Sequence, residues 1–123
     1  GLIHEDFLEC RNVYNQEMPD WSESTDQLSV VICYSNGPGG STRIYNKSPT
    51  TEDYENSENR LNYGFQEKFT ENVPYVDVHL NAGDIMIFRS TLLHSVGAVR
   101  EGERITQQCF VNILQSGELR YWS

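Results

Sequence analysis

The 123-residue chain has three histidines, and two of them stand where they could hold a metal ion. His4 lies two residues before Asp6, and side chains two apart on a strand point to the same face. The imidazole and the carboxylate can therefore converge on one ion. His94 follows a short apolar run and supplies a second imidazole. Two histidines and one carboxylate on one side of an octahedral ion suit Fe(II) and leave three positions open.

A single His-x-Asp sequence is a weak signal, because a histidine beside an acidic residue on the surface is common. A basic residue further along the chain strengthens it. Arg104 follows His94 by ten residues, at the start of a long alternating segment. A buried guanidinium recognises a carboxylate through two parallel hydrogen bonds. Arg100 competes for this role, although its place in a turn favours exposure.

The segments that must position these side chains have the pattern of short strands. Residues 28–34 are apolar on both faces and rich in β-branched side chains, which is typical of a buried strand. Residues 41–45 follow a Gly-rich turn, residues 76–80 alternate with period two, and residues 85–88 and 104–114 form two further strands. Short strands separated by Gly-rich turns indicate an all-β sandwich or barrel.

Two acidic segments, residues 9–26 and 49–74, lack the apolar runs and the alternation typical of strands. We expect the first to be an insertion or a mobile substrate loop. We expect a short helix within residues 50–74, in the part from 58 to 69. Long loops in compact domains often serve as lids, and the second segment carries aromatic side chains that could close over a ligand: Tyr54, Tyr63, Phe65 and Phe69. The alternative for this segment is a solvated surface excursion.

Length and charge limit the classes of function. A chain of 123 residues has room for one domain, here residues 1–123. It carries 18 acidic and 9 basic side chains, for a net charge of −9. This excess argues against nucleic acid or an anionic membrane as partner, since phosphate binding needs clusters of Lys and Arg. The apolar runs are too short for a helix that spans a membrane.

The three cysteines, Cys10, Cys33 and Cys109, are widely spaced and form no CxxC pair. We expect buried or idle thiols, which together with the lack of a signal peptide in this chain slightly favour the cytoplasm. The chain begins with Gly1 rather than Met, almost on its most informative motif. We therefore expect an N-terminally incomplete domain.

Longer motifs give a resemblance to a known family. Residues 82–88 (AGDIMIF) and 93–104 (LHSVGAVREGER) resemble the strand and the distal histidine signature of the Fe(II)/2-oxoglutarate-dependent dioxygenases, within their prolyl-hydroxylase-like branch. Residues 30–36 and 39–43 are similar to the central hairpin of that family. The resemblance covers most of the chain except the two irregular segments. Family members also carry a strand and helices before the His-x-Asp motif, and this chain has only three residues there.

The resemblance implies a double-stranded β-helix, or jelly roll, with the metal in the open mouth between two sheets. It implies His4, Asp6 and His94 as catalytic iron ligands and Arg104 as the partner of the distal carboxylate of 2-oxoglutarate. It further implies that the Tyr34 hydroxyl also reaches that carboxylate and that Thr42 lines the cosubstrate site. Thr106 and Phe110 share a strand face with Arg104 by period two, so we expect them to face the pocket as well. Ordinary interior packing is the alternative for all four. His79 shares a strand face with Asp77, the face opposite to Val76 and Val78, so we expect it on the surface.

The resemblance implies a hydroxylase that uses Fe(II), 2-oxoglutarate and O₂, with ascorbate as an optional further cofactor. Succinate and CO₂ are released as a protein, peptide or small-molecule substrate is hydroxylated. The alternative is a non-catalytic jelly-roll module that binds a ligand or a partner. A cupin-like metal protein is disfavoured, because cupins need a closely spaced histidine pair and this chain has no His-x-His.

Overall fold

The computed structural model describes residues 1–6 and 24–123. The insertion expected at residues 9–26 falls mostly outside the described residues, as does Cys10. The elements in chain order are β1 (Ser24–Ser35), β2 (Thr42–Tyr45), α1 (Thr51–Glu55), β3 (Arg60–Leu61), β4 (Gly64–Phe65), η2 (Glu67–Thr70), β5 (Tyr75–Val78), β6 (Ile85–Arg89), β7 (His94–Val96), β8 (Ile105–Leu114) and β9 (Leu119–Trp122).

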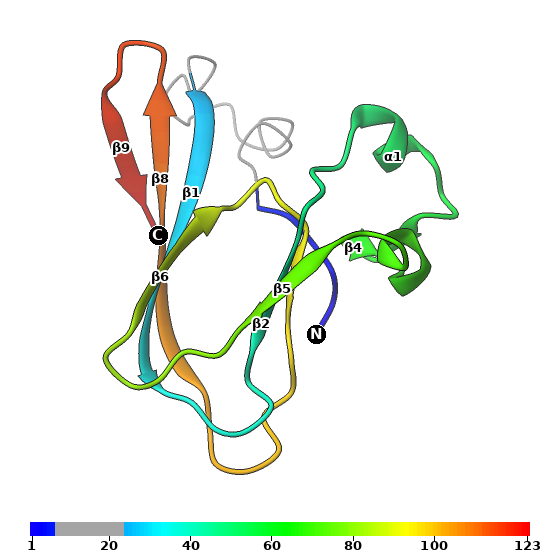
Figure 1. Cartoon of the computed structure of the whole chain (residues 1–123). Helices are drawn as coiled ribbons and strands as arrows, with labels where there is room; N and C mark the ends of the chain where they lie inside the picture. Colours follow the sequence, from blue (N-terminus) through cyan, green and yellow to red (C-terminus); the bar gives the residue numbers. More distant parts are fainter. Residues whose placement is uncertain (7–23) are drawn as a thin grey trace.

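The longer strands form two antiparallel sheets, which lie on different sides of the molecule (Figure 1). One sheet has four strands in the order β6-β1-β8-β9, and the other has three in the order β5-β2-β7. A short hairpin, β3-β4, lies with α1 to one side of the three-stranded sheet (Figure 1). The all-β expectation is confirmed, and the strands expected from the alternating and apolar runs are present.

Strand β1 is central in its sheet, because β6 pairs with one edge and β8 with the other. Its inward side chains are buried and alternate with outward ones: Gln27, Ser29, Val31 and Cys33. The outward face is apolar too, but it is more open than the expected buried strand. Tyr34 is 55% exposed there, and Ile87 on the neighbouring strand is 62% exposed.

Two clusters of buried apolar residues hold the structure together. One lies between the sheets and contains Val31, Cys33, Leu80 and Met86. The other lies where the N-terminal segment meets the β3-β4 hairpin and contains Ile3, Tyr45, Phe65 and Leu93. The second cluster joins residues that are up to 90 positions apart, so it anchors the first residues of the chain.

Part of residues 50–74 packs into this second cluster, which favours a core role over a lid for that part: Phe65 belongs to it, and Tyr54, Phe69 and Val73 pack against it. Phe65 is only 2% exposed, and its ring stacks on Phe69 with 4.7 Å between centroids. Its backbone pairs with Ile3 through a hydrogen bond of 2.8 Å. Tyr54, Phe65 and Phe69 therefore pack into a core, whereas Tyr63 stays exposed. A short helix does occur within residues 50–74, but it is α1, which the capping box of Thr50 starts. Most of the expected range 58–69 is the β3-β4 hairpin, and only the 3-10 helix η2 overlaps its end.

In the part of the chain that the structure describes, no helix has the length and apolar composition needed to cross a membrane. Cys33 is buried and Cys109 half-buried, and both are free thiols. These two positions agree with the expectation of thiols without a disulfide framework.

Replacing Phe65 by alanine should lower the free energy of unfolding by about 3–5 kcal/mol, because it empties a buried aromatic site. Tyr63→Ala is the matched control in the same hairpin. Its side chain is 73% exposed, so the change should stay within about 0.5 kcal/mol. Urea unfolding followed by circular dichroism measures both. Equally small effects would contradict a core role for residues 50–74.

Candidate metal centre

The first residues of the chain add a short bridge to the edge of β7, and this bridge joins two histidines. The N–H of His4 donates to the carbonyl of His94 at 2.9 Å, and the N–H of His94 donates to the carbonyl of His4 at 2.7 Å. Residues that exchange both hydrogen bonds stand directly opposite, with side chains on one face. The two imidazole centroids are accordingly 4.4 Å apart.

Asp6 completes the group. It is two residues beyond His4 in an extended segment, and its N–H donates to the carbonyl of Ser90 at 2.8 Å. Its Oδ2 lies 3.5 Å from Nε2 of His94, which is only 4% exposed. One ligand atom from each of His4, Asp6 and His94 lies within 4.8 Å of the others. The structure therefore brings together the three residues that the sequence singled out.

Both imidazoles are held in the orientation that metal binding requires. Nδ1 of His4 lies 2.9 Å from the carbonyl of Leu2, and Nδ1 of His94 lies 2.8 Å from the carbonyl of Leu92. A carbonyl oxygen only accepts, so each Nδ1 carries a proton, and Nε2 is the ring nitrogen left to bind a metal ion. Neutral imidazoles fixed in this way, with one carboxylate beside them, fit a divalent ion such as Fe(II).

Aromatic rings border this group on two sides. Phe88 of β6 meets the His94 ring edge to face at a centroid distance of 5.0 Å. Tyr63 approaches the His4 ring at 6.0 Å, although its side chain is 73% exposed. Neither contact was assigned from the sequence. Tyr63 is 59 positions from His4, and Phe88, although only six residues before His94, was read there only as part of a strand.

Arg104 and Thr42 meet between the two sheets. Arg104 directly precedes β8 in one sheet, and Thr42 opens β2 in the other. Nη2 of Arg104 donates to the Thr42 hydroxyl at 3.3 Å, and Thr42 is buried. Nε of Arg104 is buried with no hydrogen-bond partner among the described residues. A guanidinium with an unused buried donor fits a bound carboxylate. Arg100 is exposed, as expected for a turn.

Thr106 and Phe110 share the inner face of β8 with this arginine. Thr106 stands opposite the buried Cys33, and Phe110 stands opposite the buried Ser29. Phe110 also stacks on Trp122 with 4.5 Å between centroids. Its contacts are those of interior packing, the alternative left open for it, whereas Thr106 lies closer along the strand to Arg104.

The structure does not bring Tyr34 into this group. Tyr34 lies on the outer face of the four-stranded sheet, and its hydroxyl donates to Oε1 of Gln107 at 2.8 Å. The expectation that its hydroxyl reaches the cosubstrate is corrected here. The cause is the alternation of β1: the neighbouring Cys33 points inward, so Tyr34 must point outward.

His79 lies away from the group, on the surface, with Nδ1 3.4 Å from the hydroxyl of Ser41. This position agrees with the expectation from the sequence. It also makes His79 a suitable control for experiments on the other two histidines.

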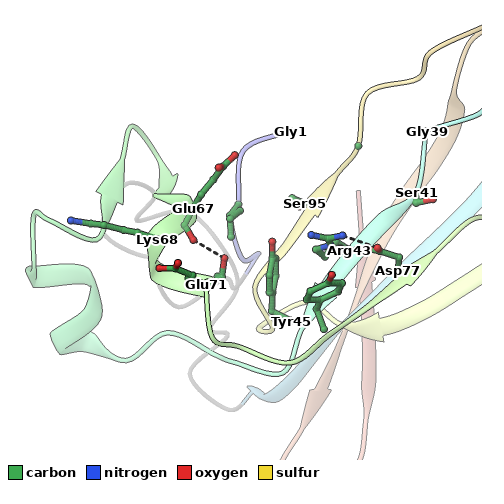
Figure 2. A pocket seen from close by; sticks show the side chains of 14 residues that line it. Gly1, Gly39, Ser41, Arg43, Tyr45, Glu67, Lys68, Glu71, Asp77 and Ser95 are labelled. Atoms are coloured by element: carbon green, nitrogen blue, oxygen red, sulfur yellow. Dashed lines mark hydrogen bonds and ion pairs between the residues drawn. The ribbon is translucent and has the colours of Figure 1, made fainter.

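A hollow of about 850 Å³ lies elsewhere, on the outer face of the three-stranded sheet (Figure 2). Figure 2 shows Arg43 and Asp77 joined on the sheet, with Glu67 and Glu71 on the other side of the hollow. Two hydrogen bonds of 2.7 Å link Arg43 to Asp77, and they lower the pKa of the Asp77 carboxyl. The arginine is thus already paired, and the chemistry of this hollow does not match the metal centre.

Comparison with known proteins finds no family model that matches the chain. It is similar to the L-gamma-glutamyl-L-propargylglycine hydroxylase of Streptantibioticus cattleyicolor, with 36% identity over 87 residues, covering 69% of this chain and 31% of that enzyme. It is also similar to the L-isoleucine 3(1)-dioxygenase of Pantoea ananatis, with 30% identity over 86 residues, covering 69% and 29%. The chain spans about a third of the length of these curated relatives.

Solved structures give the same comparison at the level of fold. An N-substituted L-amino acid dioxygenase from Burkholderia ambifaria, in complex with α-ketoglutarate, matches with a TM-score of 0.59 and 15% identity over 79% of this chain and 39% of that one. A second structure from the same organism gives a TM-score of 0.59 at 14% identity, with the same coverage. The jelly-roll expectation is confirmed. The prolyl-hydroxylase-like branch stays a prediction.

His94→Ala should abolish stoichiometric binding of a divalent ion, because it removes one of two imidazoles whose Nε2 atoms face the site. Co(II), titrated by its visible absorption, is the probe, and circular dichroism checks that the fold remains. His79→Ala is the matched control and should bind as the unmodified chain does. Retention of tight Co(II) binding by His94→Ala would overturn the assignment of the three ligands.

Proposed function

We propose that the chain carries the catalytic centre of an Fe(II)- and 2-oxoglutarate-dependent dioxygenase that hydroxylates a small amino-acid substrate. The observation that supports this most directly is the convergence of His4, Asp6 and His94, with both Nδ1 atoms bonded to carbonyls. The likeness to two bacterial enzymes, a hydroxylase and a dioxygenase, supports the same class of reaction.

In this proposal His4, Asp6 and His94 hold the Fe(II). Bound Fe(II) supplies the redox chemistry that activates O₂ and couples the decarboxylation of 2-oxoglutarate to hydroxylation. The three protein groups occupy one side of the ion and leave the other for cosubstrate and O₂. The carbonyls of Leu2 and Leu92 fix the tautomer and the orientation of the imidazoles. Phe88 packs on one imidazole and limits the access of water from that side.

Arg104 binds the distal carboxylate of 2-oxoglutarate in this proposal, and Thr42 orients the guanidinium. Support comes from the buried Nε of Arg104 and from the hydrogen bond to the Thr42 hydroxyl. Thr106 shares the same face of β8 and is the next candidate for contact with the cosubstrate. Ascorbate remains an optional reductant.

The class of substrate is inferred from the relatives and not from the cavity. Their names give a dipeptide with a non-standard side chain and free L-isoleucine as the compounds acted upon. We therefore favour a small amino-acid or dipeptide substrate over a protein. Tyr63, exposed and edge-on to His4, is placed to contact its side chain. The remaining alternative is a non-catalytic binding module, which would take up the same ligands without turnover.

Incubation with Fe(II), 2-oxoglutarate and O₂ should release succinate even without substrate, since uncoupled decarboxylation needs only these components. Arg104→Ala should raise the Kd for 2-oxoglutarate by at least about 30-fold, because losing one partner of a buried charge pair costs about 2 kcal/mol or more. Co(II) binding should be kept.

Arg100→Ala is the control, because this arginine is exposed in the turn before Arg104. If Arg100→Ala weakens 2-oxoglutarate binding and Arg104→Ala does not, the assignment is wrong by four residues. Tight binding of both ligands by the unmodified chain with no succinate would favour the binding module.

A further inference from the structure

We infer that Gln27 is a positioning residue that fixes the carboxylate ligand Asp6 through the main chain. This inference rests on the proposed metal centre and adds a residue to it. Gln27 lies on the inner face of β1, is fully buried and reaches a segment 21 positions earlier in the chain. Its hydrogen bond to this segment ends on the backbone carbonyl of Asp6, so Gln27 would act on a metal through the position of Asp6.

The peptide groups of Asp6 are held from both sides. Nε2 of Gln27 donates to the carbonyl of Asp6 at 2.7 Å, and the N–H of Asp6 donates to the carbonyl of Ser90 at 2.8 Å. Gln27 and Ser90 are also joined to each other. Nε2 of Gln27 donates to the Ser90 hydroxyl at 2.9 Å, and the N–H of Ser90 donates to the carbonyl of Gln27 at 3.0 Å. The backbone that carries the carboxylate is therefore clamped.

The amide of Gln27 is itself fixed by a chain of hydrogen bonds across the sheet. Nδ2 of Asn112 in β8 donates to Oε1 of Gln27 at 3.2 Å. Nε1 of Trp122 in β9 donates to Oδ1 of Asn112 at 2.6 Å. Both Gln27 and Asn112 are 0% exposed. Each donor must face the oxygen of the next amide, which fixes the orientation of that amide. This series of hydrogen bonds therefore directs the NH₂ group of Gln27 toward Asp6.

A second amide supports the carboxylate itself. Nε2 of Gln108 lies 3.5 Å from Oδ2 of Asp6 and donates at 2.9 Å to the hydroxyl of the buried Ser29. The 3.5 Å contact between Gln108 and Asp6 is weak. It acts on the orientation of the carboxylate and not on the backbone. Holding the backbone is left to Gln27 and Ser90.

Burying two amides between sheets is unfavourable unless every polar atom is bonded, and apolar side chains would pack there at least as well. The network ends instead on the backbone of Asp6, whose carbonyl Gln27 holds while Ser90 holds its N–H. Outer residues of this kind typically change metal affinity by about 10- to 100-fold when they are replaced.

The test is Gln27→Met, which keeps the length of the side chain and removes its donors. We expect the Kd for Co(II) to rise by about 10- to 100-fold. The visible spectrum of bound Co(II) should change as well, because the carboxylate no longer holds one orientation. Gln27→Asn, one methylene shorter, should also weaken binding, and it replaces Gln27→Met if that variant does not fold.

Val31→Ala is the matched control. Val31 is buried on the same face of β1, four residues on, and belongs to the core between the sheets. This variant should lower the melting temperature and leave both the Kd and the spectrum unchanged. Equal Co(II) affinity in the Gln27 variant and the unmodified chain, or an equal loss in Val31→Ala, would overturn the positioning role while leaving the metal centre standing. No Co(II) binding by the unmodified chain would overturn the metal centre itself.

Discussion

The exchange of two backbone hydrogen bonds between His4 and His94 is the contact on which the candidate site depends. It converts a separation of 90 positions into direct opposition across a bridge, and it puts both imidazoles on one face. Asp6 lies on the same face as the two imidazoles, because it is two residues after His4 in an extended segment. The N-terminal segment stays in place because Ile3 packs against Phe65 on its other side, in a core that includes residues 50–74. The metal centre and this hydrophobic cluster therefore depend on the same short segment.

Local periodicity made much of this arrangement predictable. The pairing of His4 with Asp6 and the shared face of Arg104 and Thr106 follow from side chains that alternate every two residues. The choice between Arg104 and Arg100 followed from the strand beginning at Ile105. Periodicity cannot say which face points inward when both are apolar. The resemblance assigned Tyr34 to the pocket, but Tyr34 belongs to the outer face, where its hydroxyl bonds to Gln107.

Composition was a poorer guide than periodicity. Residues 50–74 are acidic and short of aliphatic side chains, which suggested a lid, yet Tyr54, Phe65 and Phe69 pack into a core. Phe65 and Phe69 bury a large area although they are only two residues. A segment with a polar average composition can therefore still be packed into a hydrophobic core. The amides of Gln27 and Asn112 were missed for the converse reason. From a sequence alone, polar side chains are expected on the surface. Only the structure shows that these two amides are buried and hydrogen-bonded to partners across the sheet.

Charge explains why neutral groups surround the proposed centre. Fe(II) and the Arg104 guanidinium bring three positive charges, while the Asp6 carboxylate and 2-oxoglutarate bring three negative ones, so the loaded site has no net formal charge. A further buried carboxylate or ammonium beside it would be unbalanced and strongly unfavourable. The side chains that support Asp6 are amides and hydroxyls: Gln27, Gln108, Ser29 and Ser90. They fix its orientation by hydrogen bonding alone, and the charge balance is left to the ligands and the arginine.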